Sequence, residues 1–137
     1  MKLYFTISLV LTLFISFSQV KNKIDSLENI LNTTQTDTVK VNCYNSISFL
    51  LSRKDPEKSR ETAKLALEYA KKINYHKGIA FAFFNEGSLF RDANQYENAF
   101  ESFRNSLTYY ELEHDLKGIW TVNSCIGNVF GIKGDYK

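Results

Sequence analysis

The stretch GIAFAFFNEGSLFRDANQYENAFESFRNSLTYYELEHDLK, residues 78–117, decides the fold, because the residues that follow it begin the same pattern again at Gly118. The two copies align without a gap at a spacing of forty residues. The aligned pairs are Gly78 and Gly118, Gly87 and Gly127, Phe90 and Phe130, and Tyr96 and Tyr136. A fixed internal spacing of about 20–50 residues is typical of repeat proteins whose units pack only on their neighbours. The repeat therefore predicts an architecture more directly than a chemical activity.

The bulk composition is that of a folded chain with a nearly neutral surface. Of the 137 residues, 44% are hydrophobic and 15% aromatic, which is enough to build a core. One proline and six glycines favour long helices. The formal net charge of +2 provides no basic field, so we expect no nucleic-acid partner.

The first twenty residues have the organisation of a secretory leader. Lys2 supplies a positive start, residues 3–17 contain no charged residue, and Ser16-Phe17-Ser18 has small residues at the spacing that signal peptidase reads. The apolar run of about 15 residues is shorter than the roughly 20 that a spanning helix needs. We therefore predict a signal peptide of residues 1–18, cleaved after Ser18, and export across the cytoplasmic membrane to the periplasm.

Residues that carry catalysis or bind metals are not grouped in this sequence. Cys43 and Cys125 fall on helices separated by a whole unit, too far apart for a disulfide, and are expected to be buried apolar side chains. His76 and His114 have no ligand spacing to a cysteine. No phosphate-binding loop or nucleophile elbow occurs either. We expect no enzyme activity, no catalytic residue, no cofactor and no metal site.

Helical periodicity continues from the leader to the end of the chain. Residues 19–36 are expected to form an N-terminal capping helix and a linker, with an apolar stripe of Ile24, Leu27, Ile30 and Leu31. The sequence Asp55-Pro56-Glu57 marks a helix start, because aspartate can cap the helix and proline suits its first position. Helices are predicted over about residues 38–52, 56–73, 76–93, 96–113 and 115–130, followed by a turn over 131–135.

The central unit resembles a tetratricopeptide repeat of a long, forty-residue type. The residues that carry the resemblance are Phe83, Gly87, Phe90, Tyr96, Ala99, Phe103 and Leu107. In this pattern each small residue makes room for a large side chain on the opposite helix. The resemblance implies an all-α, right-handed superhelical solenoid of antiparallel helix hairpins. Its units would be a degenerate first unit at 37–77, a second at 78–117 and an incomplete third at 118–137.

A leader followed by such units resembles the N-terminal, exported sensor region of bacterial tetratricopeptide signalling proteins. The resemblance implies a non-catalytic module that binds a protein or a ligand. One alternative is the extracytoplasmic sensor of a membrane histidine kinase, cyclase or DNA-binding regulator, anchored through sequence beyond Lys137. Another is a purely structural scaffold. Because the third unit stops after one helix, we expect the sequence to be a fragment, and its exposed last helix to favour association.

The first helices of such units line a groove that receives a partner segment in tetratricopeptide proteins. By position, the resemblance assigns to this groove Tyr44, Asn45, Ser48, Phe84, Asn85, Ser88, Arg91, Ser124 and Asn128. The asparagines could hydrogen-bond a peptide backbone, and Arg91 could hold a carboxylate. The alternative is that Tyr44 and Phe84 pack between layers while the polar residues form a solvated face.

The implied partner is a protein or peptide, possibly the rest of the same polypeptide. No membrane contact is expected after signal cleavage, unless a transmembrane helix follows the present sequence.

Overall fold

The computed structural model describes residues 2–135, with the side chains of residues 18–132 and 134. Within this range the chain is all-α and contains no strand, which confirms the predicted fold class at that level. The helices are α1 (Lys2–Thr33), α2 (Asp37–Leu51), α3 (Pro56–Lys72), α4 (His76–Asp92), α5 (Tyr96–Leu112) and α6 (Leu116–Asp135).

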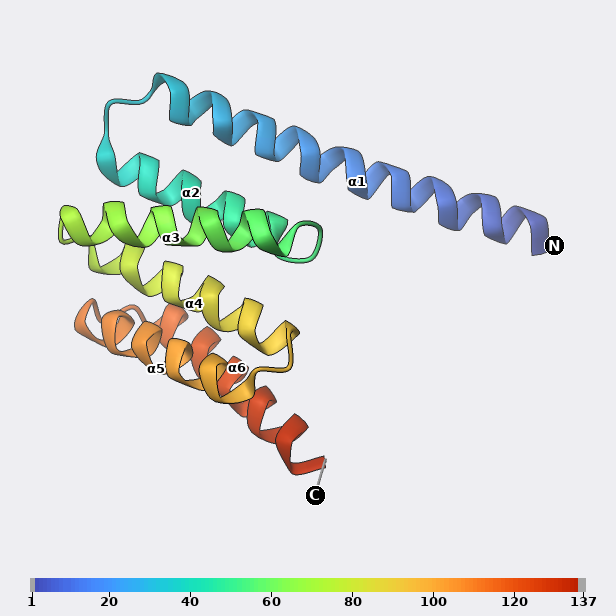
Figure 1. Ribbon diagram of the computed structural model, residues 1–137. Helices are drawn as coiled ribbons and strands as arrows, with labels where there is room; N and C mark the ends of the chain where they lie inside the picture. Colours follow the sequence, from blue (N-terminus) through green and yellow to red (C-terminus); the bar gives the residue numbers. More distant parts are fainter. Residues whose placement is uncertain (1, 136–137) are drawn as a thin grey trace.

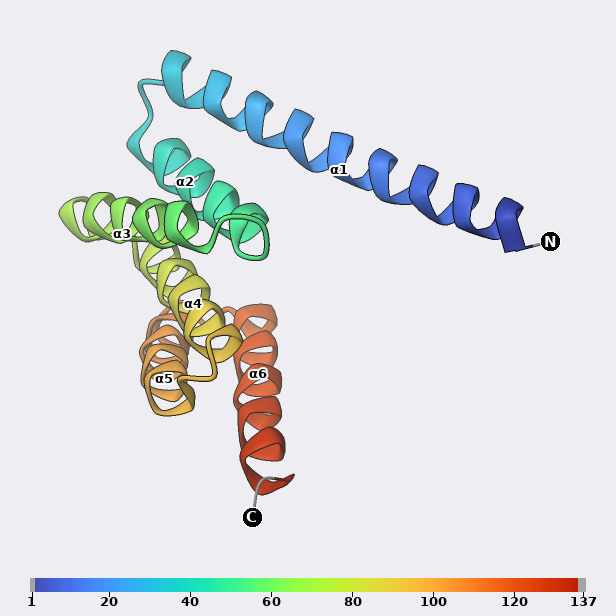
Figure 2. The same ribbon diagram turned by 45° about the vertical axis from the view of Figure 1, so that its right-hand side comes forward.

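Consecutive helices from α2 onward pack side by side. α2 packs on α3 and α4 on α5, and each pair forms a hairpin (Figure 1). α4 also packs on α3 and α2, which joins the two hairpins. Figure 2 shows α6 beside α5, whereas the N-terminal part of α1 extends away from the other helices. The C-terminal part of α1 packs on α2, and its Glu28 lies 3.9 Å from Nζ of Lys58 in α3.

Three helix ends share one hydrogen-bonding pattern that turns the chain back within a few residues. After α3, α4 and α5 the backbone takes the left-handed conformation at Asn74, Asn94 and His114, with φ of 52°, 58° and 52°. After α3, the amide of Tyr75 donates to the carbonyl of Ala70 at 2.8 Å, and equivalent bonds follow α4 and α5. This pattern satisfies helix-end carbonyls. Asn74 and His114 are forty residues apart, so the sequence repeat is also a backbone repeat.

Aspartates begin two of the helices. Oδ1 of Asp55 accepts a hydrogen bond from the amide of Lys58 at 3.0 Å, and Pro56 is the first residue of α3, which confirms the predicted helix start. Oδ1 of Asp115 accepts from the amide of Gly118 at 3.0 Å in the same way at α6. These side chains satisfy amides that have no partner within their own helix.

Gly87 and Gly118 allow helices that pack on each other to approach closely. A Cβ built on Gly87 would lie 2.7 Å from Cδ1 of Phe103, whose ring is fully buried in α5. A Cβ built on Gly118 would meet the ring of Tyr110. This ring is itself buried, and its burial raises the pKa of the Tyr110 hydroxyl to about 12. The expectation that Gly87 makes room for the second helix of its hairpin is confirmed.

The turn predicted over residues 131–135 is wrong, because α6 continues as a helix to Asp135. The residue aligned with Asn94, which ends α4 in the left-handed conformation, is Gly134. None of the described glycines has a positive φ. Since each further helical residue adds a backbone hydrogen bond, the helix continues where no left-handed residue stops it.

The predicted leader and the predicted capping helix form one element, α1. Met1 and the side chains of residues 2–17 lie outside the described part, so the signal peptide of residues 1–18 stays a prediction. Leu27 and Leu31 are half-buried, whereas Ile30 is 40% exposed. The apolar stripe predicted for this segment is therefore only partly covered.

Candidate functional site

A hollow of about 540 Å³ lies between α2 and α4, and we call it the α2–α4 pocket. It is lined by Phe49, Leu50, Ser52, Arg53, Lys54, Phe84, Ser88, Arg91 and Asp92. Three of these, Phe84, Ser88 and Arg91, belong to the predicted groove. The pocket therefore lies between the first helices of two successive hairpins, where the resemblance placed a binding surface.

Aromatic rings form the apolar part of the α2–α4 pocket and its surroundings. Phe49 is 52% exposed, and its ring centroid lies 6.4 Å from that of Phe81. Phe81 lies 6.2 Å from Phe84, which in turn lies 5.9 Å from the buried Phe103. These separations are typical of favourable aromatic pairs. The exposed ring of Phe49 is thus held by a row of aromatic contacts that leads into the core.

The charged part of the pocket is mainly cationic, with three basic residues and one acidic residue. Nε and Nη2 of Arg91 donate to Oδ1 of Asp92 at 3.0 and 2.9 Å. Nη1 of Arg91 lies 3.9 Å from Sγ of Cys125 in α6. Burial raises the pKa of the Cys125 thiol, although the nearby guanidinium opposes this effect. Arg91 therefore holds a carboxylate, as its chemistry suggested, but that carboxylate belongs to the adjacent residue.

The predicted groove residues Asn45, Ser48 and Asn85 do not face solvent, so this part of the expectation is wrong. Asn45 and Ser48 are fully buried and Asn85 is 2% exposed. Nδ2 of Asn45 donates to the carbonyl of Gly78 at 2.9 Å, and Nδ2 of Asn85 donates to the carbonyl of Asn45 at 2.9 Å. Oγ of Ser48 donates to the carbonyl of Ser59 at 2.9 Å. These side chains join helices to one another.

Among the described side chains, Oδ1 of Asn85 is a buried polar atom without a hydrogen-bond partner. Asn45 and Asn85 are forty residues apart, and the next residue at this spacing is Cys125. The hydrogen-bonded row of asparagines therefore has two members.

The remaining predicted groove residues have three different surroundings. The ring of Tyr44 stacks on Tyr69 of α3 at 5.7 Å, which agrees with the alternative that it packs between helices. Ser124 and Asn128 are exposed on α6, and Oγ of Ser124 donates to the carbonyl of Trp120 at 2.9 Å. Ser88 is only 8% exposed and donates to the carbonyl of its own helix.

A second hollow of about 380 Å³ lies between α4 and α6. It is lined by Lys77, Phe81, Phe84, Tyr110, Asp115, Lys117, Gly118 and Thr121. Nζ of Lys77 lies 2.7 Å from Oδ2 of Asp115. This contact and the bond from the Gly118 amide lower the pKa of the Asp115 carboxyl, while the same carboxylate raises the pKa of Lys77. Phe84 lines both hollows and so connects them along α4.

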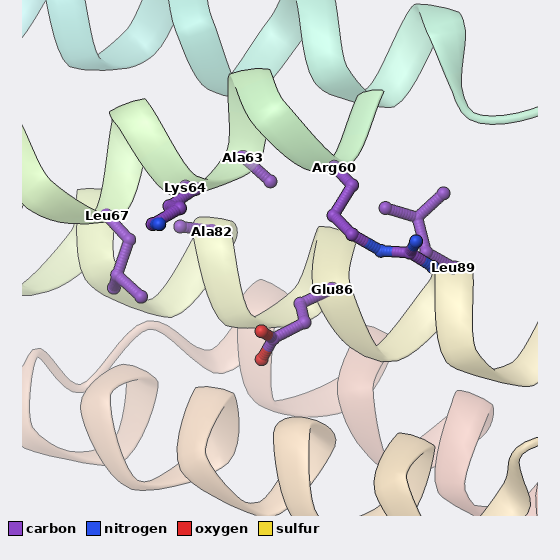
Figure 3. A pocket seen from close by; sticks show the side chains of 7 residues that line it. All are labelled: Arg60, Ala63, Lys64, Leu67, Ala82, Glu86 and Leu89. Carbon is purple, nitrogen blue, oxygen red and sulfur yellow. The ribbon is translucent and has the colours of Figure 1, made fainter. Parts of the chain in front are cut away.

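A third hollow of about 350 Å³ lies between α3 and α4 (Figure 3). Its walls are mainly apolar, with Arg60, Lys64 and Glu86 as its charged residues. Figure 3 shows the Glu86 carboxylate directed toward α5, where Ser102 donates to it at 2.8 Å. Arg60 pairs with Glu57 on its own helix at 3.2 Å. Because these two charged groups are engaged elsewhere, this hollow is a weaker binding candidate than the α2–α4 pocket.

Sequence reasoning missed Phe49, Phe81, Arg53 and Lys54. Phe49 carries a signal that could have found it, since it is an aromatic residue outside the apolar stripe of its helix. Arg53 and Lys54 follow the end of α2 in the sequence, and their place beside α4 depends on how the hairpins stack.

Several other sequence expectations can be compared with the described residues. Both cysteines are free thiols, Cys43 buried and Cys125 half-buried. No group of three or more metal-ligating side chains occurs in the described part. Of the described helical residues, none forms a segment long and apolar enough to cross a membrane.

Comparisons of this chain with protein-family models, with curated proteins and with solved structures found no match.

Proposed function

We propose that this chain is a non-catalytic, exported binding module that holds an extended protein segment in the α2–α4 pocket. An apolar side chain of the segment would lie against Phe49, and an adjacent acidic group would lie beside Arg53 and Arg91. The observation that carries the proposal is that an exposed aromatic ring and basic side chains line one hollow between successive hairpins.

Physical chemistry supports this type of ligand. An aromatic ring that is half exposed and supported from behind offers apolar area at little entropic cost. Guanidinium groups bind carboxylates with directional, charge-assisted hydrogen bonds. The guanidinium of Arg91 already pairs with Asp92, so a ligand carboxylate must compete with Asp92 for it. Arg53 is exposed and is therefore the more accessible partner. We therefore expect moderate affinity that weakens as salt is added.

We also propose that the stacked hairpins are a solenoid of the tetratricopeptide type. The forty-residue relation supports this in two places: the left-handed residues Asn74 and His114, and the bond between Asn85 and Asn45. In such an array, a ligand would lie across the first helices.

The proposal is tested with a short fluorescein-labelled peptide that has a leucine beside a glutamate, flanked by serine and glycine. Fluorescence polarisation should show binding to the full chain, and a peptide with glutamine in place of glutamate should bind about 10-fold more weakly. Phe49→Ser and Arg53→Glu should each weaken binding by a similar factor, because both positions are exposed and line the pocket.

Lys64→Glu is the matched control, since it makes the same charge change on α3, at the hollow between α3 and α4. Equal binding of the glutamate and glutamine peptides, or an equal loss in Lys64→Glu and Arg53→Glu, would contradict the proposed site. Circular dichroism of each variant shows whether the helices are retained.

A further inference from the structure

Helix α6 carries an exposed stripe along one side, which we call the α6 stripe. Its members are Leu116, Trp120, Asn123, Ser124, Gly127, Phe130, Gly131 and Gly134. At about 100° per residue these positions share one face of the helix. Leu116, Trp120 and Phe130 are 78%, 72% and 58% exposed, which is unusual for such large apolar side chains. No described side chain in the stripe is charged.

The α6 stripe differs from the corresponding face of α4, which α5 covers. Ala80 of α4 is fully buried, and its carbonyl accepts a bond from Oγ of Ser106 in α5 at 2.7 Å. The residue aligned with Ala80 is Trp120. A helix placed on α6 as α5 is placed on α4 would meet this indole at the position where α5 packs on Ala80. We therefore expect the α6 stripe to fit a partner whose surface differs in shape from that of α5.

The stripe also contains an empty notch. A Cβ built on Gly87 would clash with the ring of Phe103, whereas one built on Gly127 meets no atom of the described chain within 4 Å. The same is true of Gly131. Large side chains at Leu116 and Trp120 and small ones at Gly127 and Gly131 thus lie on one face of one helix. A surface that carries both large side chains and glycines can be complementary to a second copy of itself.

We propose that two copies of this chain associate through the α6 stripe in an antiparallel, two-fold symmetric pair. With the axis passing between Asn123 and Ser124, Trp120 faces the partner's Gly127, and Leu116 faces the partner's Gly131. Each Asn123 then faces the partner's Ser124 beside the axis, one residue from the partner's Asn123, where the polar side chains can exchange hydrogen bonds. Large residues face small ones in this register because Trp120 and Gly127 lie equally far from the axis, as do Leu116 and Gly131.

Charge and area agree with a second copy as the occupant. Like charges that face each other across a two-fold axis repel, and the described side chains of the α6 stripe carry none. Trp120 and Phe130 expose roughly 250 Å² together, given about 150–250 Å² for an aromatic side chain. Complete burial of these two rings, of Leu116 and of the neighbouring Leu112, which is 60% exposed, would remove at most about 1,000 Å² in total from the two copies. That is the lower limit for a specific interface.

The first test is the oligomeric state of the full chain by sedimentation velocity over a range of concentrations. We expect a monomer–dimer equilibrium at about 10 µM, and Trp120, the single tryptophan, should shift its emission to shorter wavelength as the dimer forms. Gly127→Leu should weaken association about 10-fold or more, because it fills the notch that receives the partner's indole. The substitution meets open space and replaces glycine within a helix, so it does not threaten folding of the monomer.

Asn128→Leu is the matched control, since it adds the same side chain to an exposed position of α6 outside the stripe. It should leave the dimer unchanged. A monomeric wild type at these concentrations would overturn the proposal. So would a dimer that Gly127→Leu leaves intact, because association would then involve another surface, such as α1.

The second test fixes the register of the pair. In a Cys43→Ala, Cys125→Ala background, Asn123→Cys places a single thiol at the proposed axis, whereas Asn128→Cys places it away from the axis. Mild oxidation should link the Asn123→Cys protein into a covalent dimer much faster than the Asn128→Cys protein. Equal rates for the two variants would show that the antiparallel register is wrong.

Discussion

At the scale of single residues, Gly87 and Gly127 occupy the same position of the repeat but have opposite surroundings. Gly87→Ala should destabilise the chain by about 1–3 kcal/mol, because the new methyl group meets the ring of Phe103. Gly127→Ala should instead stabilise the monomer by about 0.5–1 kcal/mol, since alanine favours the helix and meets open space.

Urea unfolding at low protein concentration, where association is negligible, measures both effects. The additional replacement Phe103→Leu should recover part of the loss in Gly87→Ala if the ring is its cause. A loss of stability in both glycine variants would contradict the view that only Gly87 is closely packed.

The buried asparagines show at the same scale why residue type alone did not identify a site. Asn45 and Asn85 have side chains able to bind a peptide backbone, and they do bind backbone carbonyls. Those carbonyls belong to Gly78 and Asn45 of the same chain. Because a buried amide must be paired, packing decided which carbonyl each one meets.

At the scale of helices, the ends of α3, α4 and α5 depend on one left-handed residue each. Asparagine adopts the left-handed conformation readily. His114, at φ 52°, carries the steric cost that a side chain usually has in this conformation. His114→Gly should therefore raise the free energy of unfolding by about 1 kcal/mol, whereas Asn94→Gly should change it by less. Thermal and urea unfolding of both variants measure the difference. Equal changes would show that the left-handed conformation is not the source of the gain.

At the scale of the whole molecule, Asp115 connects two successive units. Its carboxylate lies 2.7 Å from Nζ of Lys77 on α4 and accepts the amide of Gly118 on α6. These contacts lower its pKa below the ordinary value of 3.8, so the carboxylate stabilises the folded state above pH 3.8. This contribution is lost as the pH falls through the folded pKa. Lys77 is 58% exposed, so solvent screens its share.

Asp115→Asn should cost about 0.3–1 kcal/mol at neutral pH, because asparagine can still cap the helix but lacks the negative charge that favours its N-terminus. The difference from wild type should narrow below pH 3.8, where the wild-type carboxyl becomes protonated. Urea unfolding across this pH range measures it, and the exposed Glu111→Gln serves as control. A difference that is constant with pH would contradict the role of the ionised carboxylate.

The sequence by itself determined that the chain is helical and where most helices begin and end. Helical periodicity and the Asp55-Pro56 start are local signals, each expressed within one or two turns of chain, and the forty-residue spacing is visible in the sequence itself. The exception was the turn after Phe130, where the predicted break lacked the left-handed residue that ends α4.

Only the tertiary structure decided which side chains stay available for binding. Asn45 and Ser48 are buried where α4 and α3 pack on α2 and supply carbonyls to them, while Phe49 and Arg53 line one pocket with α4. The physical reason is that burial depends on contacts between residues far apart in the sequence. A helical pattern shows which residues share a face, and the packing of its neighbours decides whether that face is covered.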